Sequence, residues 1–257
     1  MNINRMRSQF TNWQILGFLA AICFLIIYIN IAEDVFTHDS IVNFDQSVSS
    51  AAQQFRTPRL TSVMLLFTCL ANWQIIGVGL LLSILFLSRR RQWFLVMALL
   101  LSVFGGEVLV FLSKISFSRG RPDTLNALIP AKGLSFPSGH AFEAITFYGF
   151  IAWILMTERQ DWPTRAAVLL VASVLAAAIG FSRIYLGVHW PSDIFASYFL
   201  ALAWLTFLTT MFRAYVPTRY ASNSAAKSFD PSVLAAVWIV AIAIFYYLHP
   251  LPNRVHQ

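Results

Sequence analysis

The sequence predicts an all-α, polytopic membrane helix bundle. Only 11% of its 257 residues are charged and 58% are apolar, whereas about a quarter of the residues in a soluble domain are charged. The mean hydropathy is +0.67, and apolar runs long enough to cross a bilayer recur along the chain. We therefore expect one integral membrane domain, residues 1–257, with six core spans and a seventh C-terminal span.

Seven apolar runs are candidate spans, because each approaches the roughly 20 residues that a helix needs to cross a bilayer. They lie at about 14–32, 62–87, 93–112, 141–157, 165–181, 194–212 and 233–248. The first run continues into Glu33-Asp34 without a small-x-small cleavage site, which favours a retained span over a secretory signal. The second run contains Asn72-Trp73-Gln74, so we expect it to begin as an interfacial turn.

The connecting segments differ in character. Residues 40–56 place apolar side chains at helical spacing among polar ones, which predicts a surface-lying amphipathic helix, with an ordered loop as the alternative. These apolar side chains are Ile41, Phe44, Val48, Ala51, Ala52 and Phe55. Residues 213–232 read as a polar cytoplasmic linker to the extra span at 233–248.

The basic residues predict the orientation of the chain in the membrane. With the N-terminus inside, ten of the 18 Lys and Arg residues lie in cytoplasmic loops and eight on the opposite side. Setting aside Lys114, Arg121 and Arg183, which we assign to a functional site, leaves ten against five, and Arg89-Arg90-Arg91 places one loop in the cytoplasm. The net charge of +7 is scattered between apolar runs, so we do not expect nucleic acid as a partner.

Three polar clusters interrupt the apolar sequence: Lys114 to Pro122, Pro137 to His140, and Ser182 to Asp193. The first follows span three, the second precedes span four, and the third links spans five and six. All three therefore emerge on the same, non-cytoplasmic face, where they can form one site. Removing charged side chains from water at the ends of membrane helices costs free energy, so their presence in these clusters indicates a function.

The third cluster holds a histidine and a carboxylate with helical spacing. His189 and Asp193 are four residues apart, so on a helix that begins near His189 the carboxylate reaches one imidazole nitrogen. The other nitrogen is then free to act as a nucleophile. The alternative is a pair of interfacial polar residues that satisfy each other.

The other two clusters hold residues that suit an anion. Ser138 can cap the helix of span four, Gly139 allows close approach of the backbone, and His140 is placed to protonate a leaving group. An ordinary helix cap is the alternative. Lys114, Arg121 and Arg183 suit the equatorial oxygens of a phosphoryl group, with Arg119 as a less certain contributor, unless these cations anchor lipid headgroups.

The order and spacing of the clusters, K-x6-RP, PSGH and SR-x5-H-x3-D, resemble the type 2 phosphatidic acid phosphatase superfamily, in its membrane lipid phosphatase branch. The resemblance covers about residues 60–212. It implies that His189 is a nucleophile that forms a phosphohistidine, that Asp193 orients it, and that His140 protonates the leaving group and activates water. It also implies phosphate binding by Lys114, Arg121, Ser138, Gly139 and Arg183, and neither a metal nor a cofactor.

We therefore expect a membrane lipid phosphate or diphosphate phosphatase in a bacterial cytoplasmic membrane, with its site on the outer face. Undecaprenyl diphosphate, phosphatidylglycerol phosphate and phosphatidic acid are candidate substrates. A phosphotransferase that uses the same intermediate and a non-catalytic transporter or scaffold are the alternatives. Glu107 and Glu143 lie within predicted spans, where they either pair between helices or, for Glu143, tune His140. The sequence does not indicate an oligomeric state.

Overall fold

The computed structural model describes residues 3–37, 41–122, 126–158 and 161–213, and within these ranges it contains helices but no strand. Five helical segments are long and apolar enough to cross a membrane, and a bent helix pair makes up to six. They coincide with the first six predicted runs, so the all-α membrane bundle is confirmed. The predicted seventh span at 233–248, and the linker beyond Arg213, lie outside the described residues.

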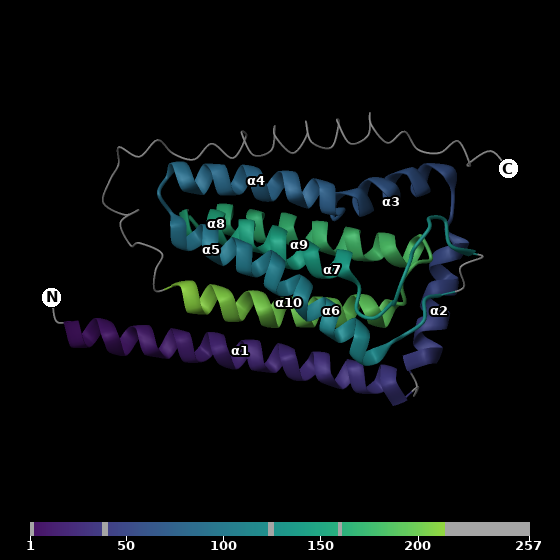
Figure 1. Cartoon of the computed structure of the whole chain (residues 1–257), viewed down its shortest axis with the longest axis horizontal. Helices are drawn as coiled ribbons and strands as arrows, with labels where there is room; N and C mark the ends of the chain where they lie inside the picture. The colour runs from purple at the N-terminus through teal and green to yellow at the C-terminus, as the bar shows by residue number, and fades with distance from the viewer. Residues whose placement is uncertain (1–2, 38–40, 123–125, 159–160, 214–257) are drawn as a thin grey trace.

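Short connections join most of the helices, whereas the longer segment 118–138 separates α6 from α7 (Figure 1). The helices are α1 (Ile3–Thr37), α2 (Ile41–Gln54), α3 (Pro58–Leu70), α4 (Trp73–Arg89), α5 (Trp93–Leu100), α6 (Gly106–Phe117), α7 (Gly139–Glu143), α8 (Gly149–Glu158), α9 (Trp162–Tyr185) and α10 (Pro191–Phe212). Two π-helical turns join α5 to α6 and α7 to α8; they are Leu101–Gly105 and Ala144–Tyr148. Each of these pairs therefore forms one continuous span.

The core of the bundle lies around α10. Buried Leu99, Phe147, Phe150 and Leu208 form one cluster among α5, α8 and α10. A second cluster, which includes Tyr28 of α1 and Phe136, packs against the first half of α10. Helices in a bilayer associate through close packing rather than by excluding water, so these contacts hold the spans in a fixed arrangement.

The second span is broken between α3 and α4, which meet at a bend of 46°. Helix α3 breaks at Ala71, its C-cap, within the predicted second run and directly before the predicted interfacial turn that begins at Asn72. A carbonyl freed by such a break must be satisfied inside the protein, since lipid offers no hydrogen bond. The hydroxyl of Tyr148 donates to the carbonyl of Leu70 at 2.6 Å and so serves this purpose.

Residues 41–54 form helix α2, as the amphipathic pattern predicted, and α2 crosses one end of the bundle (Figure 1). The expected apolar side of this helix is only partly the buried one. Phe44 and Phe55 are exposed, whereas Asp45 and Ser49 are buried together with Ala52. The reason is electrostatic: Asp45 contacts the partly buried guanidinium of Arg119 and a backbone N–H at the start of α10.

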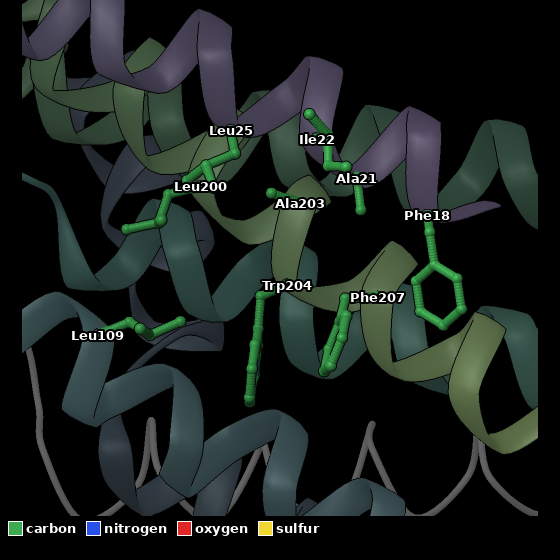
Figure 2. A pocket seen from close by; sticks show the side chains of 9 residues that line it. All are labelled: Phe18, Ala21, Ile22, Leu25, Leu109, Leu200, Ala203, Trp204 and Phe207. Atoms are coloured by element: carbon green, nitrogen blue, oxygen red, sulfur yellow. The ribbon is translucent and has the colours of Figure 1, made fainter. Parts of the chain in front are cut away.

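An apolar cavity of about 510 Å³ lies between α1, α6 and α10 (Figure 2). Its lining includes Phe18, Leu25, Leu109, Leu200 and Trp204, and none of the predicted site residues. The polar clusters therefore form their site elsewhere.

Candidate active site

The three polar clusters meet at the end of the bundle that α2 crosses, where α6 and α9 end and α10 begins (Figure 1). Hydrogen bonds donated by backbone amides tie the segments together. The amide of Ser135 donates to the carbonyl of Arg119 at 2.8 Å, and the amide of Ser138 donates to the hydroxyl of Ser197 at 2.7 Å. The three clusters therefore lie together at this end of the bundle.

His189 and Asp193 lie against each other where α10 begins. Helix α10 starts at Pro191, and its third residue, Asp193, accepts the backbone N–H of Trp190 at 2.9 Å. The same carboxylate oxygen lies 3.3 Å from Nδ1 of His189. The other ring nitrogen, Nε2, lies 3.2 Å from Nη1 of Arg121. Since the guanidinium only donates, Nε2 presents its lone pair to Arg121, and Nδ1 carries the proton toward Asp193.

The environment of His189 keeps its imidazole neutral. Only 3% of the residue is exposed, and this burial lowers the pKa of His189 to about 4 from its ordinary value of 6.5. The hydrogen bond and charge of Asp193 oppose the shift, while Arg183 and Arg121 add to it. At neutral pH the ring is therefore uncharged, with a proton on Nδ1 and one oriented lone pair on Nε2.

Arg119 forms ion pairs with two carboxylates. Its Nη1 donates to Asp193 at 2.7 Å, and its Nη2 donates to Asp45 of α2 at 2.6 Å. Asp45 also accepts the backbone N–H of Ser192 at 2.8 Å. The expectation that Arg119 contributes to phosphate binding finds no support in this geometry, because both ends of its planar fork are already paired with anions.

Sequence reasoning missed Asp45, which pairs with Arg119, and Ser135, which contacts Asp193. The hydroxyl of Ser135 donates to Oδ2 of Asp193. Asp45 could not be found from its neighbours in the sequence, since its position in an amphipathic helix indicates a solvent-facing carboxylate. Ser135 lies between the first two motifs and belongs to neither.

Lys114 and Arg121 hold the segment that leads to α7. Nζ of Lys114 donates to the carbonyl of Leu134 at 2.7 Å. Arg121 donates to the carbonyls of Val188 at 2.7 Å and Gly133 at 3.0 Å. Burial lowers the pKa of Arg121 from its ordinary value, and Asp193 opposes the shift. A cation that is desolvated in this way favours an anionic ligand.

Ser138 occupies the N-cap position of α7, as predicted, but its side chain makes no capping hydrogen bond. That part of the prediction is wrong: the amide of Ser138 donates to Ser197, and its Oγ is buried without a partner. Nε of Arg183 is also buried and unpartnered, while its Nη1 donates to Thr68 at 2.6 Å. A Cβ at Gly139 would meet no atom within 4 Å, so there is open space beside the start of α7.

His140 follows Gly139, and its Nε2 lies 3.0 Å from Oδ1 of Asn72. Deeper in the bundle, one carboxylate oxygen of Glu143 is buried without a partner, and the carboxyl of Glu107 lies close enough to interact with it. Within the described ranges, no group of three or more His, Cys, Asp or Glu side chains gathers to form a metal site.

Comparison with known proteins agrees with the motifs and with the fold. The model of the PAP2 superfamily matches residues 93–217. Phosphatidylglycerophosphatase B of Bacillus subtilis is 32% identical over 64% of this chain and 81% of the relative. Undecaprenyl-diphosphatase of Sulfolobus acidocaldarius is 29% identical over 56% of this chain and 66% of the relative.

Two solved structures resemble the fold of this chain. The crystal structure of a transmembrane PAP2-type phosphatidylglycerolphosphate phosphatase from Bacillus subtilis matches with a TM-score of 0.65 and 28% identity, over 77% of this chain and 98% of the other. Aquifex aeolicus LpxE matches with a TM-score of 0.51 and 26% identity, over 65% of this chain and 94% of the other. The motifs, the helical bundle and these relatives together show that the chain belongs to the PAP2 superfamily and is a phosphatase.

Proposed function

We propose that this chain hydrolyses a lipid phosphomonoester or diphosphate through a phosphohistidine on His189, at the non-cytoplasmic face of a bacterial cytoplasmic membrane. The observation that carries the proposal is the pair of buried, unpartnered donors, Oγ of Ser138 and Nε of Arg183. Buried polar groups are rarely left without a partner. Ser138 stands next to the open space at Gly139, and both donors suit the oxygens of a phosphoryl group.

The cations nearby suit the negative charge of that group. Arg183 and Arg121 both act electrostatically on His189, so they lie around the nucleophile. Lys114 is close enough to Arg121 and Arg183 to repel both. Asp193 offsets part of this repulsion, but one carboxylate does not balance three cations, and a bound anion would lower the remaining cost. A phosphoryl transition state spreads its charge over three equatorial oxygens and would meet this need.

In the first chemical step, the lone pair on Nε2 of His189 attacks phosphorus, and the bond from phosphorus to the lipid oxygen breaks. His140 gives its proton to the departing oxygen. Nδ1 of His189 keeps its proton and donates it in a hydrogen bond to Asp193, whose carboxylate stabilises the positive charge that develops on the ring. In the second step, water attacks the phosphohistidine and loses a proton to His140. The P–N bond breaks and inorganic phosphate leaves. No step in this scheme requires a metal ion.

The proposed face follows from the charges and the fold together. Arg89, Arg90 and Arg91 lie at the end of α4, which Figure 1 places at the opposite end of the bundle from α2. If this arginine triplet is cytoplasmic, the polar site faces outward at headgroup level. Undecaprenyl diphosphate, phosphatidylglycerol phosphate and phosphatidic acid remain the candidate substrates, and the first two are supported by the names of the relatives.

The test is a phosphate-release assay with the purified full-length protein, given each of the three lipids in mixed micelles with excess EDTA. We expect release from at least one lipid, and its loss in folded His189→Ala and His140→Ala variants. Arg59→Ala, which changes an exposed cation on α3, serves as the control and should retain activity. A strict metal requirement, or full activity of His189→Ala, would contradict the proposal. Labelled phosphate that moves to an added lipid alcohol would indicate a transferase instead.

A further inference from the structure

The break in the second span is tied to the site by two side chains that no motif contains. Oγ1 of Thr68, in the last turn of α3, accepts a hydrogen bond from Nη1 of Arg183 at 2.6 Å. Oδ1 of Asn72, just beyond the break, lies 3.0 Å from Nε2 of His140. The bent span therefore contacts one phosphate-binding cation and one of the two site imidazoles.

Asn72 makes this contact in place of a local one. It occupies the N-cap position of α4, with φ −71° and ψ 144°, yet its side chain makes no capping hydrogen bond. Asparagine is among the best N-cap residues, and a side-chain cap is worth about 1 kcal/mol. Here the acceptor oxygen is directed to His140 instead. Helix α4 therefore lacks a side-chain cap, and the imidazole of His140 has a hydrogen-bond partner that orients it.

We propose that Asn72 is a positioning residue for His140, an inference that rests on the proposed function. Because Oδ1 of Asn72 accepts a hydrogen bond from Nε2–H, Nδ1 is left as the nitrogen that exchanges a proton with the lipid oxygen and with water. The two site histidines then have partners suited to different tasks. The carboxylate of Asp193 stabilises positive charge on His189, as a nucleophile needs. The neutral amide orients His140 without forming an ion pair that would hold its proton.

This role predicts an effect that depends on the leaving group. An alkoxide must be protonated as it departs, whereas nitrophenolate can leave without a proton. Misplacing a catalytic group by about 1 Å can cost on the order of 100-fold in rate. Loss of the Asn72 contact should therefore slow the cleavage of an alkyl phosphate by about 10- to 100-fold, within the range that general acid catalysis supplies. Cleavage of an aryl phosphate should change by less than about 3-fold, because it needs no such catalysis.

The experiment measures single-turnover alcohol release from dodecyl phosphate and from 4-nitrophenyl phosphate, with the full-length protein in excess. It compares wild type with Asn72→Ala and with Asn72→Leu, which keeps the side-chain volume but lacks the acceptor. The control is Asn43→Ala, which changes an exposed asparagine of α2. Single turnover isolates the first step, so a second-step role of His140 in activating water does not enter the result.

Selective loss with dodecyl phosphate in either Asn72 variant supports the proposal. Equal loss with both esters would overturn it, since that pattern indicates a general structural defect. Failure of both variants to fold would also overturn it, because Asn72 would then be a structural residue. The proposed function fails separately if wild type cleaves neither ester, or if His140→Ala cleaves dodecyl phosphate as fast as wild type does.

Discussion

Replacing Arg119 by methionine should destabilise the protein and slow its chemistry, because Arg119 joins two buried carboxylates. Asp45 is 1% exposed and Asp193 is fully buried, and Arg119 lies 2.6 Å from one and 2.7 Å from the other. Removing one partner from a buried ion pair costs about 3–5 kcal/mol. Asp45 keeps the N–H of Ser192, and Asp193 keeps Ser135 and the N–H of Trp190. We therefore expect the lower end of that range, about 3 kcal/mol.

A double-mutant cycle makes this prediction specific. Asp45→Asn removes one of the two carboxylates that Arg119→Met leaves unpaired, so the double variant should be more stable than the sum of the single changes by about 1–3 kcal/mol. The assay is reversible unfolding in mixed detergent micelles, followed by circular dichroism, with phosphate release measured in parallel. The matched control is Arg59→Met, which changes an exposed arginine and should alter stability by less than about 0.5 kcal/mol. An Arg119→Met variant as stable as this control, or a cycle without coupling, would refute the reasoning.

Two further predictions concern His189 and the turn before it. Burial lowers the pKa of His189 to about 4 from its ordinary value of 6.5. Between about pH 4 and 6.5 the unfolded chain therefore binds more protons at this residue than the folded protein does. The contribution of His189 to the free energy of unfolding should then rise with pH across that window. Thermal unfolding of wild type and His189→Gln at several pH values checks this, and an equal pH slope in both proteins would contradict it. Gly187→Ala should cost about 1–3 kcal/mol, because Gly187 has φ +76° and a Cβ there would lie 2.8 Å from Nη2 of Arg56. Gly77→Ala, in α4 where a Cβ meets nothing within 4 Å, should be neutral or stabilising in the same unfolding assay.

The bundle could be predicted from the sequence because a bilayer imposes simple rules on length and composition. An apolar run of about 20 residues is a span almost regardless of its neighbours, and so the first six runs coincide with the candidate spans. Counting the spans between the three motifs predicted that they emerge on the same face and can therefore lie together. His189 and Asp193 are held by helical spacing, a local rule that the start of α10 satisfies.

The partners of the site residues could not be predicted, since they come from distant parts of the chain. Asp45 precedes Arg119 by 74 residues, and its pattern in α2 indicates a solvent-facing side. Ser138 and Asn72 both stand at helix starts, where local rules predict capping, yet neither side chain caps its helix. In each case a tertiary contact or an open site prevails over the local preference. Departures of this kind are expected where a site is built.

The most direct test of the central claim is to identify the residue that carries the phosphoryl group during turnover. The full-length protein would be mixed with a labelled lipid phosphate, quenched in alkali within the first turnover, digested and sequenced by mass spectrometry. We expect an acid-labile, alkali-stable phosphoramidate on His189, absent from His189→Ala and accumulating if the second step is slowed. Phosphate on a serine hydroxyl, or turnover with no covalent phosphoenzyme on any residue, would contradict the account.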